Sequence, residues 1–186
     1  MAEDFLPPEL PPVKGLCIRT FDDPRIAERI RVLDQHCLPV RYAEKYYDMY
    51  VRGGMHGYNQ LAYFHDLLIG SINCRLEPTD EEETHKLYIM TITVLEPYRR
   101  MKVGSHLLRR IMDMALHEAR FRVSEVALNV QVGSPALHFY ESFGFTEVEL
   151  VKDYYTDLDV KDAYLLHKVV PQTAANNKQQ QKKKKH

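Results

Sequence analysis

The pattern of hydrophobic and polar positions changes its period several times along the chain, and each change marks an expected element. Residues 16–21 alternate apolar and polar side chains, which predicts a first strand. An Asp-Asp-Pro sequence at 22–24 is typical of a helix start, and apolar residues three or four positions apart extend that helix to about residue 35. Residues 38–42 begin with Leu-Pro, which disfavours helical backbone, so we expect an apolar loop there.

The middle of the chain carries strong turn signals between shorter apolar runs. Two of these runs flank the dipeptide His65-Asp66, which predicts an antiparallel hairpin. The elements expected in this region are a helix over 43–51 that ends at the glycine pair 53–54, hairpin strands over 61–64 and 67–74, a solvated acidic loop over 77–85, and a central strand over 86–94.

The second half of the chain begins with a strongly amphipathic helix over residues 103–119. Apolar residues recur there every four positions from Val103 to Ala115, which predicts a helix face packed on the sheet. A strand is expected next, and then a helix with Ser134 as N-cap, Pro135 at its first position and Gly144 just beyond its end. The strands expected here cover 126–132, 146–151 and 163–168.

The resulting order, β-α-α-β-β-β-α-β-α-β-β, predicts an α/β fold in which helices cover a mixed sheet. A chain of 186 residues is expected to form a single domain, which we place at residues 15–170. Residues 1–14 are rich in proline and are expected to be a flexible leader. Residues 171–186 are rich in lysine and glutamine and are expected to be a disordered tail.

Charge is distributed unevenly along this chain. Without the five lysines of the tail, 20 basic residues stand against 26 acidic ones, a net charge of −6. An acidic body does not suggest nucleic acid as the main ligand, so no direct DNA binding is expected. The basic tail suits ribosomal RNA or an import receptor, or it is a solvated segment that keeps the protein soluble.

The positions of cysteine and histidine in the sequence argue against metal and redox sites. The three cysteines lack metal or redox spacing and fit a reducing cytoplasm. His85 lies beside acidic residues, but the spacing matches no ligand set, so no metal is expected. No apolar run approaches the roughly 20 residues that a membrane helix needs, so no membrane association is expected.

Residues 87–108 combine an apolar strand, a basic turn and the start of a helix. Arg99 and Arg100 precede Gly104 there, so cationic side chains and backbone N–H groups surround a helix N-terminus. This arrangement suits a phosphate group. The same residues also suit an ordinary helix entry with exposed arginines, and the spacing alone leaves both interpretations open.

Several segments resemble one protein family. Residues 97–108, PYRRMKVGSHLL, are similar to the coenzyme A pyrophosphate loop of the GNAT acetyltransferase superfamily, and residues 134–145, SPALHFYESFGF, resemble its later helix. Within that superfamily, residues 15–169 resemble the NatE catalytic subunits (San), which are N-terminal acetyltransferases. The segments that carry this finer resemblance are Leu38-Pro39-Val40-x-Tyr42, Leu61-Ala62-Tyr63-Phe64, Leu87-Tyr88-Ile89-Met90-Thr91, Val130-Gln131 and Tyr154-Tyr155.

The resemblance implies a GNAT fold and direct transfer of an acetyl group from acetyl-CoA to the α-amino group of a protein N-terminus. It also implies roles for particular residues. Tyr88 would relay the proton of the amine, and Tyr140 would protonate the leaving thiolate, although packing on the sheet is an alternative role for Tyr140. The residues that would bind the cofactor are Ile92, Val94, Arg99, Arg100, Met101, Lys102, Val103, Gly104, Ser105 and Tyr140.

A peptide groove is implied by the same resemblance. Its apolar pocket, with tyrosine hydroxyls at the mouth, suits an N-terminus that begins with methionine. The residues that would line it are Leu38, Pro39, Val40, Tyr42, Met90, Tyr154 and Tyr155. The implied partners are protein N-terminal peptides, the NatA complex and the ribosome, and the implied compartments are the cytoplasm and the nucleus.

The chain departs from the family pattern at four functional positions. Asn129 stands where the family has a second catalytic residue, a histidine, and a carboxamide cannot accept a proton near neutral pH. Lys102 replaces the first glycine of the phosphate motif, Gly133 replaces an asparagine that contacts CoA, and Leu38 replaces an aromatic residue. We therefore expect an enzyme slower than its relatives. The alternative is a non-catalytic GNAT-fold subunit that binds the NatA complex at the ribosome.

Overall fold

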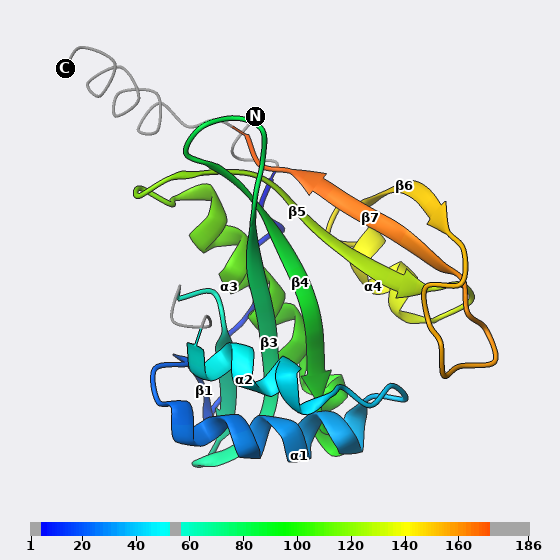
Figure 1. Cartoon of the computed structure of the whole chain (residues 1–186). Helices are drawn as coiled ribbons and strands as arrows, with labels where there is room; N and C mark the ends of the chain where they lie inside the picture. Colours follow the sequence, from blue (N-terminus) through cyan, green and yellow to red (C-terminus); the bar gives the residue numbers. More distant parts are fainter. Residues whose placement is uncertain (1–4, 53–56, 172–186) are drawn as a thin grey trace. The chain divides into compact units, whose positions relative to one another are not determined.

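The computed structural model describes residues 5–52 and 57–171 of the chain. Helices and strands follow one another in the predicted order (Figure 1). The elements are β1 (Leu16–Thr20), η2 (Pro24–Ile26), α1 (Ala27–Cys37), α2 (Glu44–Arg52), β2 (Gln60–Phe64), β3 (Leu67–Pro78), β4 (Thr84–Val94), η4 (Glu96–Met101), α3 (Val103–Leu116), β5 (Arg122–Gln131), α4 (Ala136–Glu141), β6 (Thr146–Val151) and β7 (Ala163–Val169).

The strands form a mixed sheet in the order β1-β2-β3-β4-β5-β7-β6. Strands β4 and β5 pair in parallel, whereas β1–β2, β2–β3, β5–β7 and β6–β7 pair antiparallel. The prediction of an α/β fold with a mixed sheet is therefore confirmed. Contacts divide the described residues into two compact units: residues 5–8, 76–88 and 112–171 form the first, and residues 9–52, 57–75 and 89–111 form the second.

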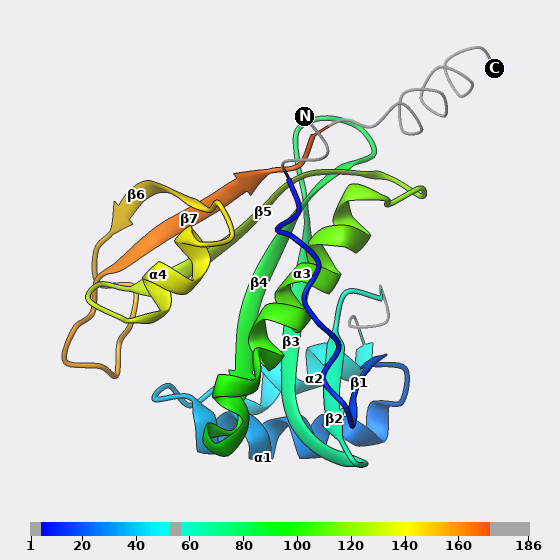
Figure 2. The ribbon, with the colours of Figure 1, turned by 180° about the vertical axis from the view of Figure 1, so that it is seen from behind.

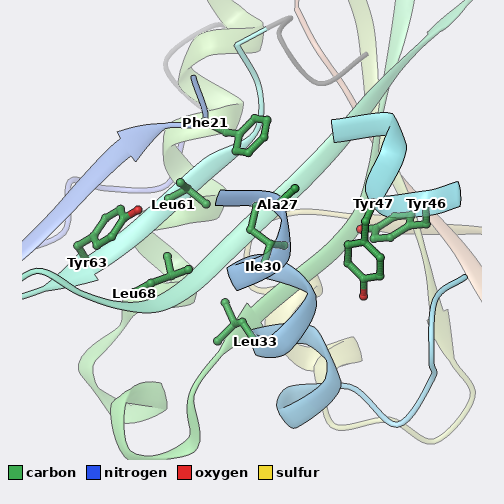
Figure 3. Packing of buried hydrophobic residues seen from close by; sticks show 9 residues of the cluster. All are labelled: Phe21, Ala27, Ile30, Leu33, Tyr46, Tyr47, Leu61, Tyr63 and Leu68. Atoms are coloured by element: carbon green, nitrogen blue, oxygen red, sulfur yellow. The ribbon is translucent and has the colours of Figure 1, made fainter. Parts of the chain in front are cut away.

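The second unit contains helices on both faces of its strands. Helices α1 and α2 cover one face of β3 and β4, and α3 covers the opposite face (Figures 1 and 2). Figure 3 shows the core between the first two helices and the strands, where side chains from α1, α2 and β2 converge. The buried members of this core cluster are Phe21, Ala27, Ile30, Leu33, Tyr46, Tyr47, Leu61, Tyr63 and Leu68.

Local chemistry explains where several of these elements begin and end. Asp23 accepts the backbone N–H of Arg25 at 3.0 Å, and Pro24 opens the helical segment, as predicted. The hairpin turn places His65 at φ 45° and Asp66 at φ 67°. Two consecutive positive φ angles match the twist of the strands that they join, so the predicted β2–β3 hairpin is confirmed.

The first unit contains the parallel pair β4–β5 and the antiparallel strands β6 and β7. Tyr88 of β4 lies opposite Ala127 of β5, and β5 in turn pairs with β7 from Glu125 to Gln131. Helix α4 lies against the face of this part of the sheet that Figure 2 presents. Gly144 follows α4 with φ 78°, which is the left-handed helix end expected of it.

Element ends differ from the sequence prediction in several places. Strand β3 continues to Pro78 and β4 begins at Thr84, so both extend into the segment expected to be an acidic loop. The prediction that Ser134 is the N-cap of α4 is wrong by one residue, because the cap position falls on Pro135. The hydroxyl of Ser134 nevertheless accepts the N–H of Ala136 at 3.2 Å, so it still serves the first turn.

The expected leader includes a buried residue. Phe5 is only 3% exposed, its carbonyl oxygen accepts a hydrogen bond from Lys168 Nζ at 2.6 Å, and that ammonium lies 4.9 Å from the centre of the Phe5 ring. Burial lowers the pKa of Lys168. The leader thus makes defined contacts at Phe5, whereas residues 172–186 of the expected tail and the glycine pair at 53–54 lie outside the described residues. Within 5–52 and 57–171, no helix is long and apolar enough to cross a membrane.

Candidate active site

Three predicted site residues of the first unit form one hydrogen-bonded chain. Tyr88 is on β4, and Asn129 is two residues beyond its register partner Ala127 on β5, so Asn129 and Ala127 share one face of that strand. The hydroxyl of Tyr88 donates to Asn129 Oδ1 at 2.8 Å. Tyr154, from the loop between β6 and β7, places its hydroxyl oxygen 3.0 Å from that of Tyr88.

The direction of this hydrogen-bonded chain follows from counting protons. A tyrosine hydroxyl has one proton to donate, and that of Tyr88 points at Asn129. The bond between the two hydroxyls is therefore donated by Tyr154 to Tyr88. The chain runs from Tyr154 through Tyr88 to a carboxamide, which accepts a hydrogen bond but takes up no proton near neutral pH.

Solvent exposure differs between the side chains of this hydrogen-bonded series. Tyr88 is 9% exposed, whereas Tyr154 is 44% exposed. Asn129 Nδ2 is buried and has no hydrogen-bond partner among the described residues. A buried donor of this kind is costly unless something accepts from it, so it marks a position suited to a water molecule or a carbonyl oxygen.

Tyr155 supports Tyr154 from the side. The two rings meet nearly at right angles, with their centres 4.9 Å apart. The backbone N–H of Tyr155 donates to Lys161 O at 2.9 Å, which anchors the loop. Burial raises the pKa of Tyr155 to about 12, so its hydroxyl remains neutral and is able to donate at physiological pH.

Tyr140 is the third residue predicted to take part in catalysis, and it lies in the same unit. It is buried on α4, with its ring centre 5.2 Å from that of Phe139 and 5.9 Å from that of Phe145. These ring contacts agree with the alternative role given for Tyr140 in the sequence analysis, which is packing. The proton-donating role remains a prediction.

The loop predicted to line the peptide groove follows α1 in the second unit. Leu38 has extended backbone, φ −106° and ψ 141°, as Pro39 requires, and its N–H donates to Asp34 O at 2.8 Å. Tyr42 stacks on Tyr46 with 4.4 Å between ring centres. Tyr42 and Met90, two of the predicted groove residues, both pack, partly buried, against the core cluster. Val40 is half-buried and Pro39 is exposed.

A buried chain of polar side chains lies between the two helices and the strands of this unit, and the sequence analysis missed it. Tyr46 of α2 bonds to Thr91 of β4 at 3.1 Å between the side-chain oxygens. At the other end, Thr93 Oγ1 donates to Asp34 Oδ1 of α1 at 3.3 Å. The links between these ends are Asn73 Nδ2 to Thr91 Oγ1 at 2.9 Å, Asn73 Nδ2 to Ser71 Oγ at 3.2 Å, and Ser71 Oγ to Thr93 Oγ1 at 3.0 Å.

Asp34 is the ionisable group of this polar chain and is 1% exposed. Burial raises its pKa to about 7, against the opposing effect of hydrogen bonds from Thr93 and Tyr47. One feature of the sequence does indicate that Asp34 is buried. Asp34 follows Ile30 by four residues, so it takes an inward-facing position on an otherwise apolar helix face.

The turn predicted to bind a diphosphate connects η4 to α3 in the second unit. Lys102 has φ 62° and ψ 17°, the left-handed conformation that a glycine would adopt without strain. The N–H of His106 donates to Lys102 O at 3.0 Å, so the N–H groups of residues 103–105 lie in the first turn of a 14-residue helix. Val103 is fully buried and fixes the helix start.

The side chains around this turn fit an anionic group. Arg100 and Lys102 are exposed, and Arg99, also exposed, donates from Nε to Val94 O at 3.0 Å. Met101, Gly104 and Ser105 are half-buried beside them, and Ile92 and Val94 are half-buried on β4. Cations together with first-turn amides are the donor set that a diphosphate requires, so the residues present fit the predicted coenzyme.

Gly133 has a backbone explanation. Its φ of 77° is left-handed, and a Cβ added there would meet nothing within 4 Å. The glycine therefore relieves backbone strain rather than making room. Among residues 5–52 and 57–171, no group of three or more His, Cys, Asp and Glu side chains is placed to hold a metal ion.

Comparison with known proteins gives consistent matches. A model of the acetyltransferase (GNAT) family matches residues 27–145. The probable N-acetyltransferase san of Drosophila melanogaster is 32% identical over 154 residues, covering 82% of this chain and 80% of the fly protein. N-alpha-acetyltransferase 50 of Danio rerio is 32% identical over 146 residues, covering 78% of this chain and 83% of the fish protein.

A solved structure is similar over the same range. Arabidopsis thaliana Naa50 in complex with the bisubstrate analogue CoA-Ac-MVNAL superposes with a TM-score of 0.73 at 32% identity. The match covers 83% of this chain and 98% of the plant chain.

Proposed function

Because this chain belongs to the acetyltransferase (GNAT) family, and within it to the N-alpha-acetyltransferases, we propose that it transfers an acetyl group from acetyl-CoA to the α-amino group of protein N-termini. The observation that carries the proposal is the 32% identity to two N-acetyltransferases over 82% and 78% of the chain. The similar plant structure contains an analogue that joins CoA, an acetyl group and a peptide beginning with methionine. The proposed activity is of the NatE type.

Acetyl-CoA supplies the acetyl group as a thioester. The diphosphate of the coenzyme suits the first-turn amides of residues 103–105 and the exposed cations of Arg100 and Lys102. The left-handed backbone at Lys102 supports this assignment, because the turn already has the conformation that a glycine would give it. The replacement of that glycine therefore costs conformational energy without changing the path of the chain.

We propose that the peptide enters by its N-terminal residue, with methionine preferred. Tyr42 and Met90 offer apolar surface in the second unit, and Leu38 begins the loop that leads to Tyr42. The hydroxyls of Tyr154 and Tyr155 belong to the first unit and suit the peptide backbone. Leu38 stands where the related enzymes have an aromatic residue, and this replacement changes the size of the apolar surface but not its polarity.

Tyr88 is the residue to which we assign contact with the reacting amine. It is nearly buried and is held on one side by Asn129 and on the other by Tyr154. The Nδ2 group of Asn129 suits a water molecule or a peptide carbonyl oxygen. Since Asn129 takes up no proton, catalysis is expected to be slower than in an enzyme with histidine at that position.

The test is release of the CoA thiol in the presence of a peptide that begins Met-Leu. Turnover above the peptide-free rate is expected, and a peptide with a blocked α-amino group should give none. Tyr88→Phe removes only the hydroxyl and should lower kcat by about 10²-fold or more. Absence of turnover with the free peptide, together with retained partner binding, would instead establish a non-catalytic subunit.

We further propose that the protein works beside the NatA complex at the ribosome, in the cytoplasm with the nucleus as a second compartment. The support is the resemblance to NatE catalytic subunits and the run of four lysines at 182–185, a charge suited to ribosomal RNA. Co-sedimentation with ribosomes should depend on the NatA subunits and fall when residues 172–186 are removed. Unchanged co-sedimentation of that truncated protein would exclude the role of the tail.

A further inference from the structure

We propose that Tyr154 carries the proton of the substrate amine from Tyr88 to solvent. The inference rests on the proposed function and adds a proton exit to it. It gives Tyr154 a role beyond contact with the peptide: Tyr154 acts through Tyr88 and is a positioning residue for the reaction.

The side of Tyr88 that faces Asn129 cannot remove a proton. Tyr88 donates to Asn129 Oδ1 at 2.8 Å, and a carboxamide oxygen accepts that hydrogen bond without becoming protonated near neutral pH. If Tyr88 took a proton from the amine and kept its own, it would carry a positive charge on a phenol, which is unfavourable. The proton of Tyr88 therefore has to leave in another direction.

Tyr154 provides that direction. Its hydroxyl oxygen lies 3.0 Å from the hydroxyl oxygen of Tyr88, within the range for direct proton transfer along a hydrogen bond. Tyr154 is 44% exposed whereas Tyr88 is 9% exposed, so of these two hydroxyls the one of Tyr154 has the readier access to water. Contact with the ring of Tyr155 keeps Tyr154 at this position.

The step balances as follows. The amine nitrogen forms a bond to the acetyl carbon, the carbon–sulfur bond breaks, and the electron pair leaves with the CoA sulfur. The surplus proton on nitrogen passes to Tyr88 Oη while the proton of Tyr88 passes to Tyr154 Oη, and the proton of Tyr154 passes to water. Both tyrosines end neutral, so no tyrosinate is left behind by the transfer.

The hydrogen bond between the two hydroxyls has to reverse for this transfer. In the structure Tyr154 donates to Tyr88, and in the relay Tyr88 donates to Tyr154. Rotation of a hydroxyl about its C–O bond is fast and moves no heavy atom. The reversal breaks the bond from Tyr88 to Asn129 only transiently, and Asn129 restores the starting orientation.

The first experiment measures kcat at saturating peptide and acetyl-CoA for Tyr154→Phe, which keeps the aromatic contact and removes the hydroxyl. We expect kcat to fall at least tenfold. Tyr164→Phe is the matched control: Tyr164 pairs with Val130, the residue after Asn129, so it projects from the opposite face of the strands and its loss should leave kcat unchanged.

The second experiment repeats Tyr154→Phe in an Asn129→His background. The imidazole accepts a proton from Tyr88, so the same substitution should then lower kcat less than threefold. An equal loss in both backgrounds, or an effect on the peptide KM with kcat unchanged, would show that Tyr154 only binds the peptide and would overturn the relay.

A third measurement separates proton transfer from structural support. Tyr154→Ala opens space beside Tyr88, and added imidazole should restore kcat in proportion to its concentration without affecting the Tyr164→Phe control. Failure of imidazole to raise kcat in Tyr154→Ala, together with loss in both backgrounds, would overturn the relay. Absence of CoA release from the unmodified protein would overturn the proposed function itself and the relay with it.

Discussion

At the scale of single residues, Asn129 is the departure with the largest chemical consequence. It holds Tyr88 in place at 2.8 Å and leaves a buried Nδ2 group without a partner among the described residues. A buried amide donor is stabilised by an acceptor, and a water molecule or a peptide carbonyl oxygen suits this position. This contact supports the proposal that Asn129 orients Tyr88 rather than accepting its proton.

Asn129→His is expected to raise kcat by about tenfold or more, because an imidazole with a pKa near 6.5 accepts the proton that a carboxamide cannot. Steady-state kinetics of CoA release checks this, with acetyl-CoA KM as an internal reference that should change less than twofold. An unchanged kcat in Asn129→His would mean that the carboxamide does not limit the reaction.

Asp34 is expected to make the stability of the folded protein depend on pH. Its folded pKa of about 7 lies above the unfolded value of about 3.9, so the folded protein holds the proton more tightly. Stability contributed by this group is present at low pH and is lost as the pH rises from about 4 to about 7. A shift of this width corresponds to a few kcal/mol at most, at about 1.4 kcal/mol per unit.

Asp34→Asn is therefore expected to stabilise the protein at pH 8 by roughly 1–4 kcal/mol and to change little at pH 5, because the amide resembles the neutral acid. Denaturant unfolding at both pH values measures the difference. Asp157→Asn, at an exposed loop position, is the control and should show no such dependence. A destabilised Asp34→Asn protein at pH 8 would show that the carboxylate is needed in its charged form.

At the scale of elements, periodicity predicted the order of helices and strands and the β2–β3 turn, because burial on one face leaves a regular pattern. It placed the start of β5 four residues late, since residues 122–125 are extended by pairing with β4 rather than by their own hydrophobicity. The buried polar chain was missed for a similar reason. Ser71 and Asn73 have the alternation of a solvent-facing strand, but they bond to Thr91 and Thr93 of β4, which in turn bond to Tyr46 of α2 and Asp34 of α1.

The sequence predicted which single residues belong to the candidate site but not which of them lie in contact. The motif residues were named from the sequence, yet the contact between Tyr88 and Tyr154 joins residues 66 positions apart. No local pattern reports a pairing of that kind. The geometry of the η4–α3 turn, in contrast, is local, and a non-glycine residue there has a measurable consequence.

Lys102→Gly is expected to stabilise the protein by about 0–1.6 kcal/mol. Relief of the left-handed backbone gains roughly 1–2 kcal/mol, and the greater freedom of glycine in the unfolded chain costs about 0.4–1 kcal/mol. Both Lys102→Gly and the control Lys102→Ala lose the ammonium beside the turn, so acetyl-CoA affinity measured by calorimetry should fall to a similar extent in the two proteins. Lys102→Ala removes the same ammonium but keeps the strain, so it should have the stability of the unmodified protein.

At the scale of the whole molecule, the two compact units divide the proposed roles between them. The tyrosines and Asn129 belong to the first, and the cofactor turn and the apolar loop after α1 belong to the second. Strand β4 contributes to both, with Tyr88 in one and Met90 in the other. Family membership accounts for the whole described domain, whereas activity depends on a few positions within each unit.

Acetyl-CoA should therefore raise the melting temperature of the whole protein, since a ligand that binds only the folded state stabilises it by mass action. At a concentration of about 100 times Kd the gain is about 2.7 kcal/mol, which for a chain of this size is a rise of roughly 5–10 °C. Arg100→Ala removes an exposed cation beside the turn and should reduce the rise without lowering the melting temperature of the free protein. No rise at millimolar acetyl-CoA would mean that the turn does not hold the coenzyme, and the chain would then act as a binding subunit with the fold of an acetyltransferase.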